Sequence, residues 1–380
     1  MMTPIRSALA CNLDTHILQA ALPLLEAEKV QALEWSFDAL QTHSSLPDWF
    51  QELLQTYSRA GRLVGHGVFF SLLSGRWSPQ QQAWLDQLRT LADKFAFDHV
   101  TEHFGMMTGR DFHKGAPLGV PLTASTLAIG IDRLKRLSDA CRCPVGIENL
   151  AFAYSMDEVD RHGDFLHRLI EPVDGFIILD LHNLYCQSHN FGIEPLALLR
   201  RYPLDRVREI HVSGGSWSDV PSRPGRRIRR DTHNEAVPFT VFDLLEQALD
   251  VCPNLLYVVL EQIGDGLRTE TQQRHFRQDF LRMDALVQQQ NQTLKRPWLR
   301  SFHPDPPVVP DAVPYEDADL YAQQVWLAEI LETATDYRQA RQWLAESSLA
   351  NSAWEVERWE PAMLETAIAI AQKWQHGFTP

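Results

Sequence analysis

Cysteine is scarce in this chain of 380 residues, and long apolar runs are absent from it. An odd number of cysteines without a repeated spacing argues against a disulfide framework and favours a reducing compartment. No apolar run approaches the roughly 20 residues that cross a bilayer, and the first residues are too polar for a secretory signal. We therefore expect a cytoplasmic protein with no membrane partner. The five cysteines are Cys11, Cys141, Cys143, Cys186 and Cys252.

Positive charge is also in short supply, with 35 Lys and Arg against 49 Asp and Glu, a formal net charge of −14. Such a chain has no general electrostatic attraction to nucleic acid, so no nucleic-acid partner is expected. One arginine-rich segment is the exception, and it leads directly into Asp231 and His233. It is either a solvated loop or a clamp for an anionic substrate or an acidic peptide. Its arginines are Arg223, Arg226, Arg227, Arg229 and Arg230, of which Arg227, Arg229 and Arg230 are the candidates for binding an anion.

Short apolar runs alternate with longer amphipathic stretches along the first 290 residues, which is typical of βα units and a parallel sheet. The stretches between the runs, such as Pro79–Phe95 and Phe239–Val251, have the apolar spacing of helices. Eight strands of this kind predict a closed (β/α)8 barrel. An open doubly wound sheet is the main alternative, but no glycine-rich phosphate loop follows the first strand. The eight runs are Ser7–Leu13, Val30–Phe37, Leu63–Phe69, Phe97–His103, Val145–Asn149, Phe176–Leu181, Arg208–Ser213 and Leu256–Glu261.

The composition changes after Gln290, where a proline-rich segment that suits neither a helix nor a central strand begins. We divide the chain into a barrel domain (1–290), a proline-rich linker (291–314) and a small helical module (315–380). The module is expected to contain three amphipathic helices, with its tryptophans more often in the core than on a binding surface. These are Tyr315–Thr333, Asp336–Ser347 and Pro361–Gln375, and the tryptophans are Trp326, Trp343, Trp354, Trp359 and Trp374.

Ionisable and amide side chains gather at the ends of the predicted strands, which is where active sites of such barrels form. Each alone is weak evidence of a site. Together they would bring many anions and imidazoles to one mouth, and bound cations are the simplest way to offset their repulsion. Mixed imidazole and carboxylate donors suit iron, manganese or zinc. The residues are His66, His103, Glu148, Asn149, Asp180, His182, Asn183, His211 and Glu261, with Asp231 and His233 in the loop after the seventh strand.

Seven other histidines have no such placement, and we expect them at the surface or at helix caps. They are His99, His113, His162, His167, His275, His303 and His376.

Seven motifs between about Ser7 and Gln290 resemble, in the same order, those of the multinuclear non-heme iron-dependent oxidative enzymes. This family includes the methanobactin-biosynthesis oxidase. The motifs are GHGVFFSL, VTEHF, IENLAFAY, ILDLHNLYCQSHN, IHVSGG, RRDTHNEAVP and LEQIG.

The resemblance implies a xylose-isomerase-like barrel that binds two or three iron ions in mixed Fe2+/Fe3+ valence and uses dioxygen as co-substrate. Its reaction would oxidise a residue, typically cysteine, in a ribosomally made precursor peptide. Catalytic roles would fall to His66, Glu148, Asp231 and Glu261, with Glu148 and Glu261 as bridging carboxylates. The implied metal ligands are His66, His103, Glu148, Asp180, Asn183, His211, Asp231, His233 and Glu261, and further candidates are His182, Asn149 and Asn190.

Three departures from the family pattern bear on the third metal position and the substrate pocket. His182 stands for the first of two paired asparagines, Phe191 for a histidine, and Gln262 for an arginine. In related systems a separate protein delivers the precursor peptide, and the helical module is a candidate for that role here.

The ligand types by themselves leave two other functions open. One is a hydrolase, phosphodiesterase-like, or a sugar isomerase that uses zinc or manganese as a Lewis acid. The other is a non-catalytic protein that binds peptide in the presence of metal.

Overall fold

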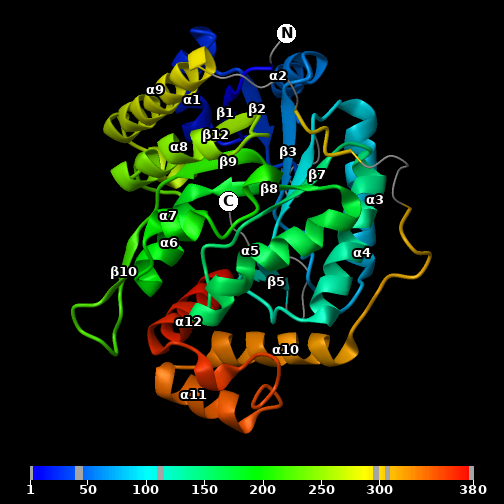
Figure 1. The fold of residues 1–380 in the computed structure, drawn as a ribbon, viewed down its shortest axis with the longest axis vertical. Coiled ribbons are helices and arrows are strands. Elements are labelled where there is room, and N and C mark those ends of the chain that lie inside the picture. The colour runs from blue at the N-terminus through cyan, green and yellow to red at the C-terminus, as the bar shows by residue number, and fades with distance from the viewer. Residues whose placement is uncertain (1–2, 39–45, 109–114, 294–298, 304–308, 376–380) are drawn as a thin grey trace.

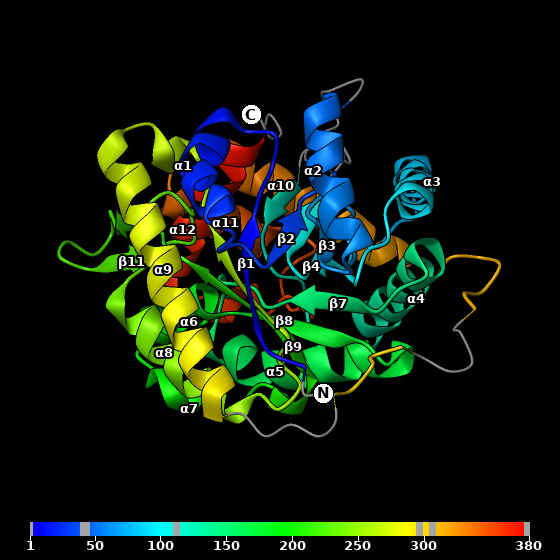
Figure 2. The ribbon, with the colours of Figure 1, turned by 90° about the horizontal axis from the view of Figure 1, so that it is seen from above.

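A computed structural model describes residues 3–38, 46–108, 115–293, 299–303 and 309–375. Eight parallel strands form a closed barrel in the order β1-β2-β3-β4-β7-β8-β9-β12, with β12 pairing back to β1. Figure 2 looks at these strands with the helices arranged around them. The predicted (β/α)8 barrel is confirmed. Its strands are β1 (Arg6–Ala10), β2 (Ala32–Trp35), β3 (Leu63–Gly67), β4 (Val100–His103), β7 (Val145–Glu148), β8 (Phe176–Asp180), β9 (Val207–Ser213) and β12 (Tyr257–Glu261).

The helices that follow the strands bury one face each against the barrel, which is the pattern that their apolar spacing predicts. Six of them begin at a side-chain cap that accepts hydrogen bonds from backbone N–H groups of the first turn; the caps are Asp14, Ser78, Thr123, Ser155, Asp180 and Glu194. The helices are α1 (Thr15–Glu26), α2 (Asp48–Arg59), α3 (Pro79–Lys94), α4 (Ala124–Cys141), α5 (Met156–Ile170), α6 (Leu181–Phe191), α7 (Pro195–Leu199), α8 (Phe239–Val251) and α9 (Glu270–Thr293), with 3-10 turns η1 (Glu171–Val173), η2 (Leu204–Arg206) and η3 (Gly264–Leu267).

Two short antiparallel hairpins extend the loops that follow strands of the barrel. The first pairs β5 (Met106–Thr108) with β6 (Gly115–Pro117) after β4, and the second pairs β10 (Trp217–Asp219) with β11 (Arg227–Arg229) after β9. The sequence analysis did not predict either hairpin, because three-residue strands show no periodicity. The arginine-rich segment is therefore partly a β-hairpin.

Apolar side chains such as Val64 and Val259 and ionisable ones such as Glu209 and His99 are both buried in the barrel interior. Strand residues alternate between the interior and the helix layer. In the lower interior, Phe176 of β8 packs against Phe302, which is fully buried and belongs to the proline-rich segment. Phe302 thus lies at the amino-terminal end of the barrel, and α9 continues three residues past Gln290 to Thr293.

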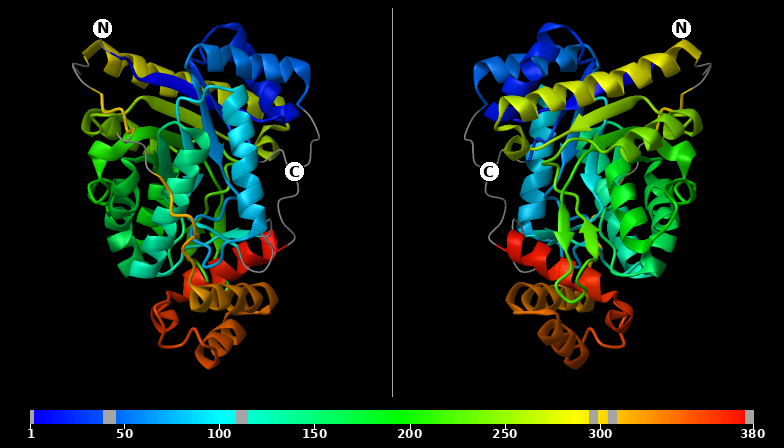
Figure 3. Two further views of the ribbon diagram at one scale, coloured as in Figure 1. Left: turned by 90° about the vertical axis from the view of Figure 1, so that its right-hand side faces the viewer. Right: turned by 90° about the vertical axis from the view of Figure 1, so that its left-hand side faces the viewer.

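The C-terminal region is helical, as predicted, and consists of α10 (Ala318–Thr333), α11 (Tyr337–Glu346) and α12 (Pro361–Trp374), with a 3-10 turn η4 (Val356–Arg358) before α12. Figures 1 and 3 show it at one end of the barrel. Trp354 and Trp359 are buried, as expected of core residues, whereas Trp326 is 53% exposed. Trp343 and Trp374 are half-buried.

This C-terminal region packs on the loops that follow the barrel strands. The Gln324 side chain accepts a hydrogen bond from the backbone N–H of Gly75 (2.9 Å) and donates one to the carbonyl of Leu73 (2.9 Å), in the loop after β3. After β7, Tyr154 stacks on Trp359 with ring centroids 3.8 Å apart. The three helices therefore lie over the end of the barrel where the predicted site residues gather.

None of the described helices is long and apolar enough to cross a membrane. All five cysteines are free and buried, which agrees with the absence of a disulfide framework.

Gly75 lies in close contact with the start of α10. A Cβ there would lie 2.6 Å from the backbone nitrogen of Tyr321 and 2.7 Å from the carbonyl oxygen of Asp317. We expect Gly75→Ala to destabilise the protein by about 1–3 kcal/mol, as overpacking does, and to speed proteolysis within 315–375. Thermal unfolding and limited proteolysis measure both effects.

Gly119→Ala is the matched control, since a Cβ there meets only the Leu150 side chain at 3.8 Å. Equal melting temperatures for the two variants would contradict the close packing at Gly75.

Candidate metal centre

The ionisable side chains predicted at the strand ends come together in the mouth of the barrel. Two groups of these residues offer ligand atoms that lie within 4.8 Å of one another, and Glu148 belongs to both. The first group contains His66 and His103, and the second contains Asp180 and His211. Asp231, His233 and Glu261 lie beside the second group.

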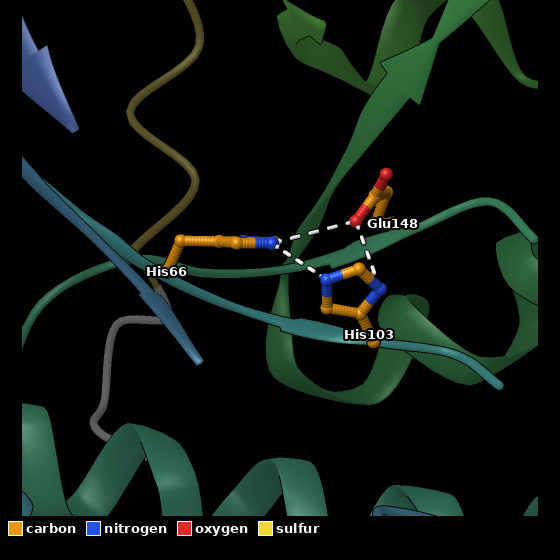
Figure 4. A group of neighbouring side chains, drawn as sticks. All are labelled: His66, His103 and Glu148. Carbon is orange, nitrogen blue, oxygen red and sulfur yellow. Dashed lines mark hydrogen bonds and ion pairs between the residues drawn. The ribbon is translucent and has the colours of Figure 1, made fainter. Parts of the chain in front are cut away.

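His66, His103 and Glu148 form the first group, shown in Figure 4. The Nε2 atom of His66 lies 2.9 Å from Nε2 of His103 and 3.5 Å from Oε2 of Glu148, and His103 Nδ1 lies 3.2 Å from the same oxygen. Strand pairing puts His103 of β4 directly beside Glu148 of β7. The three side chains therefore face one point from three strands.

Thr101 fixes which nitrogen of His66 faces this group. The Thr101 hydroxyl donates to the carbonyl of Gly65 (3.2 Å) and lies 2.8 Å from Nδ1 of His66. Because the hydroxyl proton is already used, its oxygen accepts the Nδ1 proton of His66. The lone pair of His66 Nε2 is then left for a metal ion.

The other oxygen of Glu148 faces the second group. Asn183 donates to Glu148 Oε1 (3.2 Å) and to the carbonyl of Asn149 (2.9 Å). Its own amide oxygen has no hydrogen-bond partner. Asp180 ends β8 and caps α6, where one carboxylate oxygen accepts from the backbone N–H of Asn183 (2.6 Å). The remaining Asp180 oxygen is free for another partner.

His211 of β9 stands at the centre of the mouth, with its two nitrogens in different surroundings. Nδ1 lies 3.2 Å from Oε2 of Glu261 and 4.0 Å from Oε1 of Glu148. Nε2 lies 3.0 Å from Oε2 of Glu34, deeper in the barrel.

Asp231, His233 and Glu261 form the outer part of the cluster. His233 Nε2 lies 2.9 Å from Asp231 and its Nδ1 lies 3.4 Å from Glu261. The backbone of His233 is left-handed, with φ +50°. A non-glycine residue rarely adopts this conformation, and such strain is concentrated at functional sites.

Six buried polar atoms of these residues have no hydrogen-bond partner, and this is the observation that tests the fit of a metal. Buried polar atoms are nearly always paired, since an unpaired one loses its hydration without compensation. Four of these atoms make no hydrogen bond but face an imidazole or carboxylate of the cluster at 3.2–3.5 Å, and the other two are an oxygen of Asp180 and one of Asn183. The donor set therefore fits one or more metal ions. The atoms are Glu148 Oε2, Asp180 Oδ2, Asn183 Oδ1, His211 Nδ1, His233 Nδ1 and Glu261 Oε2.

Without a metal ion, the pKa values of the cluster side chains are shifted in different directions. Burial raises the pKa of Asp180 to about 7, with a further contribution from Asp231, and it lowers the pKa of His103 to about 4. Burial alone would lower the pKa of His211, but the facing carboxylates raise it well above its usual value. Protons thus occupy parts of the cluster where a cation would otherwise balance the carboxylates.

The outer side chains of the cluster are partly exposed and the inner ones are buried. The side chains of His103, Asp231, Glu261 and His233 are 27, 21, 18 and 13% exposed, whereas those of His66, Glu148 and His211 are at most 1% exposed. A cavity of about 200 Å³ is lined by Asn234, Glu235, Ala236 and Gln262, which lie near His233 or Glu261 in the chain, and by residues of η3 and α9.

Three further candidate ligands make hydrogen bonds to the cluster or beside it. His182 lies 3.0 Å from Asp231 through Nδ1 and accepts a hydrogen bond from Arg229 (3.0 Å) through Nε2. Asn149 bonds both backbone groups of Asp180, and Asn190 bonds both backbone groups of Arg229. In these positions His182 and Asn149 support Asp231 and Asp180, and Asn190 supports the Arg229 that contacts His182.

The three candidate arginines differ in accessibility. Arg229 is buried and engaged with His182, so it supports the cluster and has no free face for an anion. Arg227 is exposed and lies over the ring of Trp217 at 5.0 Å, while Arg230 is half-buried. Only Arg227 and Arg230 remain open to a solvent-borne anion.

Two carboxylates that the sequence analysis missed, Glu34 and Glu209, lie beneath His211 and are buried. Glu34 lies within a strand whose neighbouring residues are all buried, and Glu209 lies at a similar mid-strand position, so only the alternation of strand residues could have indicated them. The expectation that His99 and His162 lie at the surface or cap helices was wrong: both are buried. His99 is held between Glu209 and Asp98. His113 and His376 lie outside the described residues.

A sequence profile described as "RiPP precursor modification enzyme MbnB/TglH/ChrH" matches residues 25–266. The matched region contains all nine predicted ligands. It ends before the C-terminal helices.

Similar proteins have been found in several bacteria. A UPF0276 protein of Acaryochloris marina is 30% identical over 224 residues, which are 55% of this chain and 77% of that protein. A UPF0276 protein of Caulobacter vibrioides is 29% identical over 48% of this chain and 62% of its own length. Among solved structures, a xylose isomerase domain protein from Planctomyces limnophilus is 14% identical, with a TM-score of 0.48, over 76% of this chain and 99% of that one.

Metal affinity should depend on pH through Asp180. Its raised pKa of about 7 means that a metal ion displaces a proton below this pH. From Asp180 alone we expect affinity for Co(II) to rise about tenfold between about pH 6 and pH 8. His103, with a pKa of about 4, is already neutral and adds no slope. Competition with a chelator at several pH values measures the change.

Asp180→Asn should weaken binding and flatten the pH profile. The matched control is Glu158→Gln: burial also raises the pKa of Glu158 to about 7, but its carboxylate bonds the backbone of Tyr154. An equally steep profile in Asp180→Asn would rule out this role for Asp180.

Proposed function

Because the chain belongs to the family of RiPP precursor modification enzymes MbnB/TglH/ChrH, we propose that it oxidatively modifies a residue of a ribosomally synthesised precursor peptide. We propose cysteine as that residue, two or three iron ions of mixed valence as the cofactor, and dioxygen as co-substrate. The observation that carries this proposal is the set of six buried, unpaired ligand atoms around Glu148 and His211.

The arrangement of Glu148 supports more than one ion. One of its oxygens faces His66 and His103, and the other lies toward Asn183 and His211. A carboxylate placed in this way can bridge two cations. Glu261 lies between His211 and His233, and a single oxygen, Oε2, approaches both histidines.

Each part of the cluster would then have its own role. His66, His103 and Glu148 would hold one ion, Asp180, Asn183 and His211 a second, and Asp231, His233 and Glu261 a third. The imidazole and carboxylate donors suit iron, which when bound supplies the redox chemistry with dioxygen. The catalytic set would be His66, Glu148, Asp231 and Glu261.

The protein itself would bind and orient the peptide and limit water. The reacting residue would enter beside His103, Asp231 and His233, whose side chains are partly exposed. Arg227 and Arg230, on the same loop as Asp231, could hold acidic residues of the peptide.

Metal content and oxidation state test the proposal directly. In protein expressed with iron-57 and purified without oxygen, we expect two or more irons per chain by elemental analysis, with Mössbauer signals of coupled sites. His66→Ala and Glu261→Ala should each lose most of this iron, because both remove a ligand from a shared cluster. His167→Ala, which alters a histidine outside the cluster, is the matched control and should retain it.

With iron bound, co-expression with short cysteine-containing peptides encoded beside its gene should change a peptide's mass, and the change should be absent without oxygen. Stoichiometric zinc that does not yield to iron would instead favour a hydrolase or isomerase and exclude the dioxygen reaction.

We also propose that the C-terminal helices take part in peptide recognition. They cover the barrel end through Gln324 and Trp359, so a peptide that approaches the cluster passes close to them. A separate partner protein remains the alternative for this role.

Hydrogen exchange distinguishes recognition by the C-terminal helices from recognition by a separate partner protein. If the helices bind peptide, a modified precursor should slow exchange in α10 or α12 as well as in the loop 213–237. Protection of that loop alone would assign recognition to another protein.

A further inference from the structure

A buried column of charged groups continues from the metal cluster into the barrel interior. Below His211, Glu34 and Glu209 are both at most 1% exposed. Glu209 contacts His99, and His99 Nδ1 lies 3.0 Å from Asp98. Arg208 donates to Asp98 (2.8 Å) near the opposite end of the barrel. None of these five residues is among the predicted ligands.

His211 is the only member of this column that also faces the cluster. Its Nε2 atom lies 3.0 Å from Glu34 and 3.4 Å from Glu209, both of which are acceptors when ionised. Its Nδ1 atom faces Glu261 and Glu148, which are candidate ligands. A neutral imidazole carries one proton, and the inner carboxylates favour its location on Nε2.

We propose that Glu34 is a positioning residue: its carboxylate accepts the Nε2 proton of His211 and thereby keeps the lone pair of Nδ1 directed at the metal cluster. The inference rests on the proposed metal centre and adds to it a residue on β2, a strand that supplies no predicted ligand. β2 and β9 are not neighbours in the barrel, so this contact crosses its interior.

Glu34 is better placed than Glu209 for this role. Its oxygen is the closer of the two to Nε2 and makes the hydrogen bond, whereas Glu209 has one oxygen engaged with His99. The second oxygen of Glu34 has no hydrogen-bond partner. Its pairing with His211 is therefore the main interaction that orients this carboxylate.

A carboxylate behind a histidine ligand has two physical effects. It fixes the tautomer and the ring orientation, and it makes the coordinating nitrogen a stronger donor. Replacing Glu34 by Gln removes the charge and introduces an amide N–H that can donate to Nε2. That donation favours the proton on Nδ1, which is the wrong tautomer for a ligand there.

The test uses the full chain loaded with Co(II) alone, whose visible absorption reports ligand geometry. We expect Glu34→Gln to change this spectrum and to speed Co(II) release to a chelator about 10- to 100-fold, the usual effect of losing such a partner. Glu34→Asp, which keeps the charge, should restore part of the wild-type rate. Glu158→Gln is the control for loss of a carboxylate away from the cluster and should match the wild type.

A double-mutant cycle with His211→Asn separates positioning from direct ligation. If Glu34 acts through His211, Glu34→Gln should have no further effect on release once His211 is replaced. Loss of one Co(II) per chain in Glu34→Gln, with an unchanged release rate for the remainder, would make Glu34 a ligand and overturn the proposal.

The remaining outcomes distinguish this inference from the proposed function. A wild-type protein that binds Co(II), with Glu34→Gln identical to it in spectrum and release, would overturn the role of Glu34 alone. A wild-type protein that binds neither Co(II) nor iron would overturn the metal centre and this inference together. Near-ultraviolet circular dichroism of each variant confirms that it is folded.

Discussion

Ionisable side chains that gather in a space closed to water repel one another, and each of them loses its hydration, unless opposite charge lies among them. The side chains in the mouth of this barrel supply only part of that opposite charge. His211 and His233 balance some of the carboxylates, while Glu148 and Asp180 each keep a buried oxygen without a hydrogen bond. Cations bound among these groups would offset the remaining repulsion.

The barrel provides the geometry because alternate strand residues point inward and parallel strands end at the same rim. Neighbouring residues then orient the candidate ligands, because the strands alone do not fix how these side chains point. Thr101 orients His66, Asn149 holds the backbone at Asp180, and His182 holds Asp231. Helix α6 adds a second constraint, since its cap, Asp180, is also a candidate ligand. Precision in the cluster therefore depends on residues that carry no metal.

The barrel was predictable from sequence because its strands are short apolar runs with polar residues at their ends. The candidate ligands were found for the same reason. Glu34 and Glu209 were not, because they lie within their strands among buried residues, where only the alternation of strand residues could have indicated them. His99 appeared unremarkable in sequence, and only its burial between two carboxylates reveals its place. The two hairpins and the position of the C-terminal helices depend on tertiary packing, which no local pattern contains.

Gln324 and Gly75 are 249 residues apart in the chain, yet their hydrogen bond helps to hold the C-terminal helices over the barrel mouth. Contacts of such large sequence separation form late, and residues near the carboxyl end leave the ribosome last. During synthesis the strands that carry the candidate ligands are therefore made before the C-terminal helices that lie over them.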